Sequence, residues 1–167
     1  ISNERIRDEF EKMLVTKRVK QAMRILKITG LLKHVMPELQ DTMGITQNKH
    51  HDKDVFNHIM DVVQAVPPDI PKRLAALFHD IGKPATRSVV NHEVHFYSHE
   101  GIGAEMAGEI MKRLKYPTDI TKKVQSIVSN HMRLKAGGKT GEKITDKALR
   151  KLKRDIGDHI DDLLDIM

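Results

Sequence analysis

Four histidines and one aspartate in this sequence are of the types that ligate metal ions: His58, the adjacent pair His79-Asp80, His99 and His131. Imidazole nitrogens together with a carboxylate suit a divalent transition metal. The chain contains no cysteine, which excludes a thiolate zinc site, an iron–sulfur cluster and a cysteine nucleophile. Any metal site here must therefore be built from imidazoles and carboxylates.

Helical periodicity turns three of these histidines toward the interior. We expect helices over 54–66, 99–115 and 118–134. At 100° per residue, each helix carries one histidine on or beside its apolar side. These are His58 next to Val62, His99 between Met106 and Ile110, and His131 among Val124, Ile127 and Val128.

The predicted helix over 72–81 is apolar nearly all round. One side carries only large apolar residues, and the other combines two alanines with His79 and Asp80. Such a helix should be buried. A buried, ionised aspartate is costly unless it is paired, hydrogen-bonded or bound to a metal. We therefore predict that the four histidines and Asp80 converge in one pocket around a metal ion.

A simpler interpretation exists for each histidine taken alone, namely a hydrogen-bonded core or surface residue. The metal prediction depends on several of them pointing inward together with an aspartate. We interpret the remaining six as surface residues, although His51 or His95 could lie at the rim of the site: His34, His50, His51, His92, His95 and His159.

The predicted fold is all-α: a helical bundle preceded by a helical arm. Ser2 is a good N-cap for the first helix, and prolines and glycines separate most of the later ones. The only strand-like stretch, over 85–98, flanks Asn91-His92 and predicts one small β-hairpin. We expect an arm over 1–45 and a metal-binding domain over 46–167.

Composition narrows the function classes. The 167 residues carry a net charge of +6, which fits an anionic partner such as RNA or nucleotides, or simply a basic surface. With no tryptophan and few other aromatics, the chain has little with which to stack single-stranded bases. No apolar run is long enough to cross a membrane, and we expect a cytoplasmic protein. Because the chain starts at Ile1, we also expect it to be a piece of something longer.

The string Phe78-His79-Asp80-Ile81-Gly82-Lys83-Pro84, with His58 about 20 residues earlier, resembles the HD superfamily of metal-dependent phosphohydrolases. In that family a first histidine, the His-Asp pair and a later aspartate bind metal inside a helical bundle. His99 and His131 resemble the longer branch, which adds two histidines and can hold a second ion.

A narrower resemblance covers most of the chain. Residues 1–14 and the segment from Leu26 to Leu39 look like the neck of bacterial-type tRNA nucleotidyltransferases, the CCA-adding and poly(A) polymerase-like enzymes, which precedes an HD domain. Their catalytic head would need a Gly-Ser strand turn together with an Asp-x-Asp metal pair, and this chain contains no such combination. We therefore expect no nucleotidyl transfer from it.

The resemblance implies a phosphodiesterase or phosphatase acting on 2′,3′-cyclic phosphates and 2′-phosphates of nucleotides or RNA ends, tRNA included. His58, His79 and Asp80 would hold one divalent ion, which could be Mn, Fe, Co, Ni, Zn or Mg. His99 and His131 would either bind a second ion or place the attacking water and the leaving group. Lys83 would contact phosphate, or else serve only as a cation near a helix C-terminus.

Two other functions remain open at this stage. The chain could be a non-catalytic helical body that binds tRNA or a partner, with a relic HD motif, or a nucleotide-signalling hydrolase or sensor. Nothing in the sequence favours DNA or fixes an oligomeric state.

The late aspartate of the HD pattern is missing from its expected place. Five aspartates of the closing segment are the candidates for this ligand: Asp155, Asp158, Asp161, Asp162 and Asp165. On a helical projection they lie outside the apolar stripe and form a solvated acidic face. We therefore expect none of them to be a ligand. Asp146 suits the start of its helix instead. We expect the parent protein to carry its last metal-binding aspartate beyond Met167, at about position 170 or 171, where the helical projection returns inward.

Overall fold

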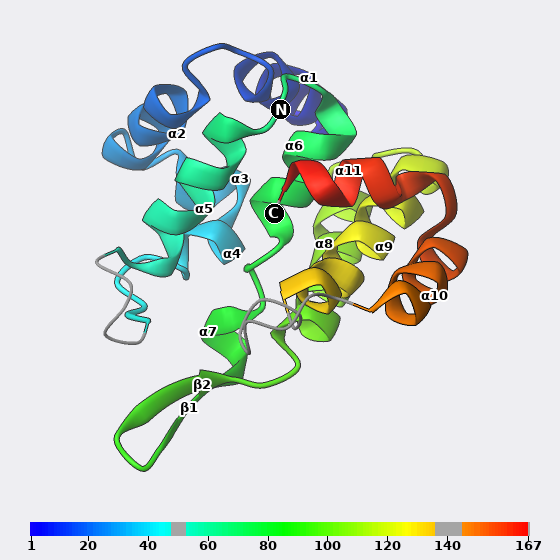
Figure 1. Ribbon diagram of the computed structural model, residues 1–167. Coiled ribbons are helices and arrows are strands. Elements are labelled where there is room, and N and C mark those ends of the chain that lie inside the picture. Colours follow the sequence, from blue (N-terminus) through cyan, green and yellow to red (C-terminus); the bar gives the residue numbers. More distant parts are fainter. Residues whose placement is uncertain (48–52, 136–144, 167) are drawn as a thin grey trace.

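Helices form nearly all of the regular structure (Figure 1). The computed structural model describes residues 1–47, 53–135 and 145–166. None of the described helices is long and apolar enough to cross a membrane. The N-terminal half contains α1 (Asn3–Leu14), α2 (Val19–Ile28), α3 (Leu32–Val35), α4 (Pro37–Gln40), α5 (Val55–Ala65) and α6 (Ile70–Phe78).

The C-terminal half begins with a short helix and a hairpin and ends in helices. Its elements are α7 (Lys83–Thr86), β1 (Arg87–Val90), β2 (Glu93–Phe96), α8 (His99–Arg113), α9 (Thr118–Lys135), α10 (Asp146–Ile156), a 3₁₀ turn at Gly157–His159 and α11 (Ile160–Asp165). This arrangement confirms the predicted all-α class.

Side-chain caps fix where several of these helices begin. The Ser2 hydroxyl accepts a hydrogen bond from the Arg5 amide and starts α1, as the sequence predicts. Asp54 caps α5 in the same way through the Asn57 amide, and Asp69 caps α6 through the Lys72 amide. The cap at Asp54 thus fixes the start of α5, the helix that carries His58.

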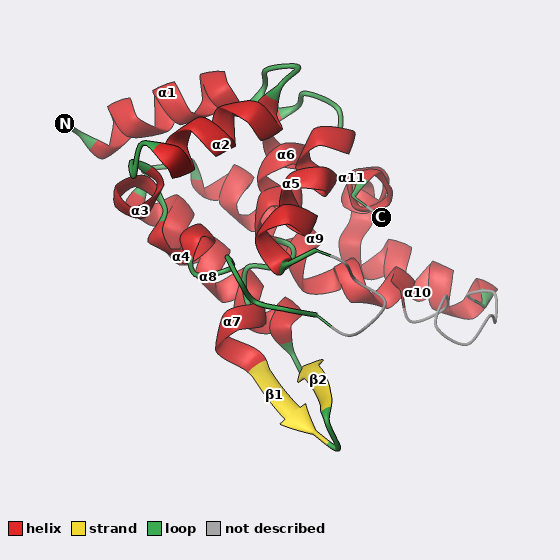
Figure 2. Ribbon diagram, turned by 90° about the vertical axis from the view of Figure 1, so that its left-hand side faces the viewer, coloured by secondary structure: helices red, strands yellow, loops and turns green. Residues whose placement is uncertain are grey.

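The predicted hairpin is present as an antiparallel pair in which Val90 faces Glu93 and Arg87 faces Phe96. Asn91 and His92 both have positive φ, at 51° and 64°, the backbone geometry of a tight two-residue hairpin turn. Figure 2 shows the hairpin projecting from the helical body beside α7. Its base, at Phe96, leads within three residues into α8.

The core lies where α6 packs against α5 and α9, with α8 running beside α9. Helix α6 is buried along most of its length, and its largest fully buried side chains include Leu74, Leu77 and Phe78. Phe10 and Leu14 of α1 belong to the same buried cluster as α6. Helices α10 and α11 pack against α9, and α11 also contacts α6.

The predicted helix over 72–81 ends earlier than expected. Helix α6 stops at Phe78, and residues 79–82 form a tight turn in which the amides of Ile81 and Lys83 bond to the carbonyls of Phe78 and Asp80. In a continuous helix the ring of Pro84 would meet the carbonyl of Asp80, four residues earlier, which forbids continuation. His79 and Asp80 therefore lie on a turn and not on a helix face.

A buried arginine ties the N-terminal helices to α6. Arg73 is 3% exposed, and its guanidinium donates to the carbonyls of Leu14, Thr16 and Val66 at 2.5, 2.6 and 3.2 Å. Burial lowers the pKa of this guanidinium from its ordinary value. One guanidinium thus satisfies three backbone carbonyls, and its contacts with Leu14 and Val66 are buried.

Replacing Arg73 by Met should therefore strongly destabilise the fold. The change leaves buried carbonyls without a donor, and each such loss costs about 1–3 kcal/mol. We expect the free energy of unfolding in urea to fall by about 3 kcal/mol or more. The control is Arg24→Met at an exposed position of α2, for which a change within about 0.5 kcal/mol is expected. Equal effects of the two variants would contradict the role of Arg73.

Candidate metal centre

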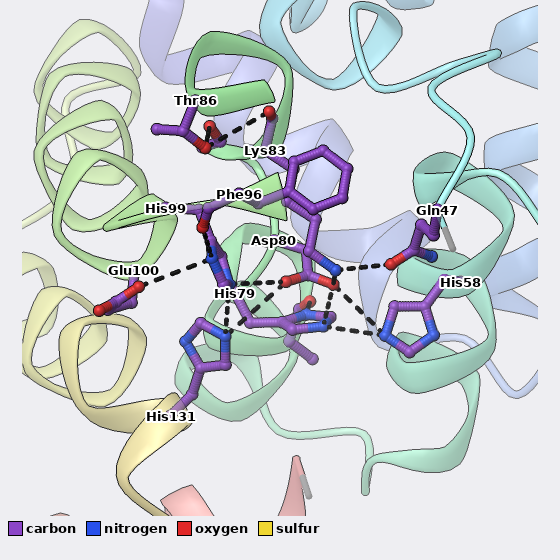
Figure 3. Close-up of polar contacts among 12 residues, drawn as sticks. Gln47, His58, His79, Asp80, Lys83, Thr86, Phe96, His99, Glu100 and His131 are labelled. Carbon is purple, nitrogen blue, oxygen red and sulfur yellow. Dashed lines mark hydrogen bonds and ion pairs between the residues drawn. The ribbon is translucent and has the colours of Figure 1, made fainter. Parts of the chain in front are cut away.

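The five side chains predicted to converge do so from four parts of the chain (Figure 3). His58 comes from α5, His79 and Asp80 from the turn after α6, His99 is the first residue of α8, and His131 lies in α9. Figure 3 shows Asp80 in the middle, with imidazoles on both sides.

Asp80 divides the cluster into two triads, one for each carboxylate oxygen. The outer triad is His58, His79 and Asp80 Oδ2: the two Nε2 atoms lie 3.4 and 3.2 Å from Oδ2 and 3.4 Å from each other. The inner triad is His99, His131 and Asp80 Oδ1, with corresponding distances of 3.3, 3.7 and 3.3 Å. Each triad offers three ligand atoms around one point.

Three of the histidines are anchored alike, each to a carbonyl three residues earlier. The Nδ1 atoms of His79, His99 and His131 lie 2.7, 2.8 and 2.7 Å from the carbonyls of Ala76, Phe96 and Val128. A carbonyl can only accept, so each Nδ1 carries the proton and donates it. In the neutral ring, Nε2 then presents a lone pair toward Asp80.

The environment of the pocket favours the neutral form of the His131 ring and the ionised form of the Asp80 carboxylate. Burial lowers the pKa of His131 from its ordinary value, so its ring is neutral at pH 7. Burial of Asp80 opposes its ionisation, but its interactions with His79, His131 and His99 outweigh burial and hold its pKa well below its usual range. Among the described residues, Asp80 Oδ1 has no hydrogen-bond donor although it is buried.

These observations fit a divalent ion. An ionised carboxylate and neutral imidazole nitrogens repel one another at 3.3 Å unless a cation lies between them. Ligand bonds of about 2.0–2.1 Å in tetrahedral geometry give ligand separations of about 3.3 Å, close to the distances in both triads. Carbonyl-anchored imidazoles are also the usual support of metal-bound histidines.

Gly82 allows the Asp80 turn to approach the start of α8. A Cβ atom on Gly82 would lie 2.3 Å from the carbonyl oxygen of His99 and 2.7 Å from the amide nitrogen of Gly103. Both are backbone atoms, so a side chain would push α8 away from the turn. The glycine of the His-Asp-x-Gly string is therefore a packing requirement for bringing Asp80 to His99.

Lys83 lies at the outer triad. Its ammonium donates to Asp80 Oδ2 at 2.8 Å and to Gln47 Oε1 at 2.7 Å, and lies 5.4 Å from the centre of the Phe96 ring. Because α6 ends at Phe78 and Lys83 begins α7, the interpretation of Lys83 as a cation at a helix C-terminus is wrong. Its contact with phosphate stays a prediction.

Two neighbours of the site were not foreseen from the sequence. Gln47 holds Lys83 from a segment that reads only as a polar loop, and Phe96 supplies both the carbonyl for His99 and the ring beside Lys83. Neither residue type signals a metal site. The one regularity is position: Phe96 lies three residues before His99, as Ala76 and Val128 lie three residues before His79 and His131, and each supplies the carbonyl that anchors its histidine.

Of the two histidines considered for the rim of the site, His51 and His95, only His95 lies in the described residues. His95 lies on β2 and stacks on Tyr97, with ring centres 5.1 Å apart, and does not join either triad. His50 and His51 fall outside the described residues.

Within the described range, no aspartate from the C-terminal helices joins the cluster around Asp80. The expectation that these aspartates form a solvated face is wrong for Asp162, which is 7% exposed. Its carboxylate lies 2.7 Å from the Lys123 ammonium and 3.6 Å from that of Lys72. Lysines of α6 and α9 thus bury an acidic residue that the helical projection places outside.

Comparison with known families agrees with this geometry. Residues 69–166, more than half of the chain, match the HD domain family, and the chain belongs to it. HD domains bind divalent metals, and the two triads are groups that could hold one. Residues 1–43 match a second family, described as the probable RNA- and SrmB-binding site of polymerase A.

Individual relatives include two enzymes that are named as tRNA nucleotidyltransferases. The A-adding enzyme of Deinococcus radiodurans is 34% identical over 136 residues, which cover 77% of this chain and 31% of the relative. The CC-adding enzyme of Thermus thermophilus is 34% identical over 139 residues, 78% of this chain and 32% of the relative. The multifunctional CCA protein of an Azoarcus species is also 34% identical, over 121 residues. The chain spans about a third of the length of these relatives.

The packing role of Gly82 gives a direct test of how the site is assembled. Gly82→Ala should lower the free energy of unfolding by about 1–3 kcal/mol and weaken binding of Mn²⁺ by at least about tenfold, as loss of a supporting contact does. Gly101→Ala is the control, since a Cβ there meets no atom within 4 Å and alanine is the better helix former. Electron paramagnetic resonance measures the Mn²⁺ affinity of both variants. An affinity that is unchanged in Gly82→Ala would contradict the packing role of Gly82.

Proposed function

We propose that this chain is a metal-dependent phosphohydrolase that acts on phosphate esters of nucleotides or RNA ends, of the 2′,3′-cyclic phosphodiesterase or phosphatase type. The observation that carries the proposal is the buried Asp80 carboxylate between two pairs of imidazoles whose Nε2 atoms all face it. We further propose that residues 46–167 form the hydrolase and residues 1–45 an RNA-facing arm.

The chemistry requires one or two divalent ions held by His58, His79, Asp80, His99 and His131. A divalent ion in such a site lowers the pKa of a bound water and polarises a phosphoryl oxygen. The carbonyl contacts keep His79, His99 and His131 in the tautomer that leaves Nε2 available. Asp80 supplies a fixed negative charge to both triads.

Lys83 contributes the charge that an anionic substrate needs. Its ammonium is at the outer triad, and His58 beside it is 27% exposed, whereas the side chains of His79 and Asp80 are 1% exposed. A phosphate would therefore approach from the side of His58 and Lys83. The lysine ammonium acts there as a point charge on the phosphate oxygens.

The net charge of the chain and its similarity to known proteins both bear on the substrate class. The net charge of +6 favours an anionic partner. The relatives act on tRNA by their names, and residues 1–43 match an RNA-binding family. These findings support RNA 3′ ends, including those of tRNA, as substrates.

A second candidate function is a non-catalytic body that binds tRNA or a partner. It is favoured by a surface depression of about 430 Å³ at the start of α2 and the end of α5, lined by four cationic residues and two glutamines: Lys17, Arg18, Lys20, Gln21, Arg24 and Gln64. Basic side chains grouped in this way suit a phosphate backbone. Metal content separates the two functions, since the second needs no ion.

The hydrolase proposal is tested with the purified chain, loaded in turn with Mn²⁺, Co²⁺, Ni²⁺, Zn²⁺ and Mg²⁺. The substrates are 2′,3′-cyclic AMP, 2′-AMP and a short RNA ending in a 2′,3′-cyclic phosphate. We expect hydrolysis with at least one metal, and a loss of about 100-fold or more in His79→Ala and Asp80→Ala, because each removes a ligand and not merely an outer partner. Product analysis distinguishes cyclic-bond opening from phosphate release.

The matched control is His34→Ala, which removes an exposed histidine on α3 and should leave turnover unchanged. If the Asp80→Ala variant keeps its turnover at a controlled free metal concentration, the hydrolysis belongs to another site. A folded chain that takes up none of the five metals and hydrolyses none of the substrates would favour the binding function.

A further inference from the structure

The hairpin carries a pair of stacked aromatic rings outside the metal centre. His95 of β2 and Tyr97, just past the end of β2, have ring centres 5.1 Å apart and an interplanar angle of 6°. Residues two apart along a strand lie on the same face, so the two rings lie on the hairpin face opposite Phe96. Because the hairpin projects from the helical body (Figure 2), the pair lies on a protruding part of the molecule.

The core gains little from this pair. Tyr97 is 64% exposed, whereas Tyr116, the other tyrosine of the chain, is 8% exposed and packs in the core. Tyr97 does not belong to the hydrophobic cluster of the described residues. An aromatic ring that lies open to solvent and is backed by a second, parallel ring offers a flat surface on which another flat ring can stack.

The backbone places these rings close to the metal centre. Tyr97 precedes the candidate ligand His99 by two residues, so their Cα atoms lie within about 7 Å of each other. Between them, Ser98 has a left-handed backbone with φ 59°, which forms the corner from the hairpin into α8. An RNA strand whose terminal phosphate lies at the centre can therefore bring a nearby base against Tyr97.

Charge favours RNA as the occupant. Arg87 begins β1 directly opposite Phe96 and is exposed, so a cation lies at the base of the hairpin. Glu93, the acidic residue of the two strands, lies at the far end beside the turn. A base stacked on Tyr97 thus has its phosphate nearer to the cationic end of the hairpin than to the acidic one. The match of residues 1–43 to an RNA-binding family points to the same kind of partner.

We propose that Tyr97, backed by His95, is a stacking platform for an unpaired base of an RNA strand whose 3′ end lies at the metal centre. This inference rests on the RNA-end substrate of the proposed function. Proteins commonly hold unpaired RNA bases by stacking them on aromatic side chains, and such stacking accepts any base, since every base has a π face. Phe96 contacts the centre and the platform lies on the opposite hairpin face, so the stacked base is upstream of the terminal nucleotide.

The experiment measures binding of a single-stranded RNA hexamer with a 3′-phosphate to the full chain loaded with Zn²⁺, at one salt concentration. Anisotropy of a 5′ label gives the affinity. Tyr97→Leu, which keeps an apolar side chain but removes the ring, should weaken binding about fivefold or more, as loss of one stacked base does. Tyr97→Phe, which keeps the ring, should stay within about twofold of the wild type.

Tyrosine fluorescence reports the stacking directly. The chain has two tyrosines and no tryptophan, and Tyr116 is buried. We expect the hexamer to quench the fluorescence of the wild-type chain. In Tyr97→Phe most of that quenching should disappear although the affinity is kept.

Val89→Ala is the matched control. Val89 is 57% exposed and lies on the hairpin face that carries Val94 and Phe96, so its truncation should change the affinity by no more than about twofold. The mononucleotide 3′-AMP has no upstream base, and its affinity should be the same in all variants.

Hexamers that each lack one base locate the stacked position. Removal of that base should weaken binding to the wild-type chain about as much as Tyr97→Leu does. The two changes together should cost no more than either alone, because they remove the same contact. Fully additive losses at every position would contradict the platform.

The outcomes separate the platform from the hydrolase. Unchanged hexamer affinity in Tyr97→Leu, an equal loss in Val89→Ala, or no hexamer binding by the wild-type chain would overturn the platform and leave hydrolysis of 2′,3′-cyclic AMP untouched. Affinity that depends on Tyr97 in a chain without hydrolase activity would support the platform and contradict the hydrolase. Circular dichroism checks folding, and if Tyr97→Leu is unfolded, the hexamers that lack one base and the quenching in Tyr97→Phe decide.

Discussion

One buried carboxylate determines the arrangement of this protein's functional centre. Asp80 is 1% exposed, and a carboxylate at such a position is tolerated only when cations or donors surround it. Three imidazoles around it have their protons committed to backbone carbonyls. The local structure therefore presents lone pairs from several sides and creates the need for a cation, which is what distinguishes a metal centre from an ordinary cluster of buried histidines.

The position of Asp80 depends on how the backbone turns after α6. Pro84 prevents the helix from continuing, and the tight turn over 79–82 points His79 and Asp80 toward α5, α8 and α9 at once. The absence of a side chain at Gly82 then allows α8 to begin in contact with this turn. A short stretch of sequence thus specifies both the ligands and the close packing that brings the distant ligands to them.

The sequence was sufficient to predict the elements with strong periodicity, but not the departures from it. Projection at 100° per residue placed His58, His99 and His131 on inward faces, and each lies in the cluster. The same projection misjudged Asp162, because the lysines that bury it come from α6 and α9 and no single-helix pattern contains them. It also extended α6 over His79 and Asp80, which lie in the turn between α6 and α7; Pro84 keeps these two helices from being continuous, and apolar periodicity does not register such a break.

The hairpin and the polar segment before α5 both contribute contacts to the centre. Phe96, at the base of the hairpin, fixes the tautomer of His99 in the inner triad through its carbonyl and lies against the Lys83 ammonium through its ring. Gln47 accepts a hydrogen bond from that ammonium. The tautomer of His99 and the position of the Lys83 ammonium therefore both depend on residues from connecting segments and not from the bundle itself. The helices and the turn after α6 supply the candidate ligands, and the connecting segments hold the Lys83 ammonium beside Asp80 Oδ2.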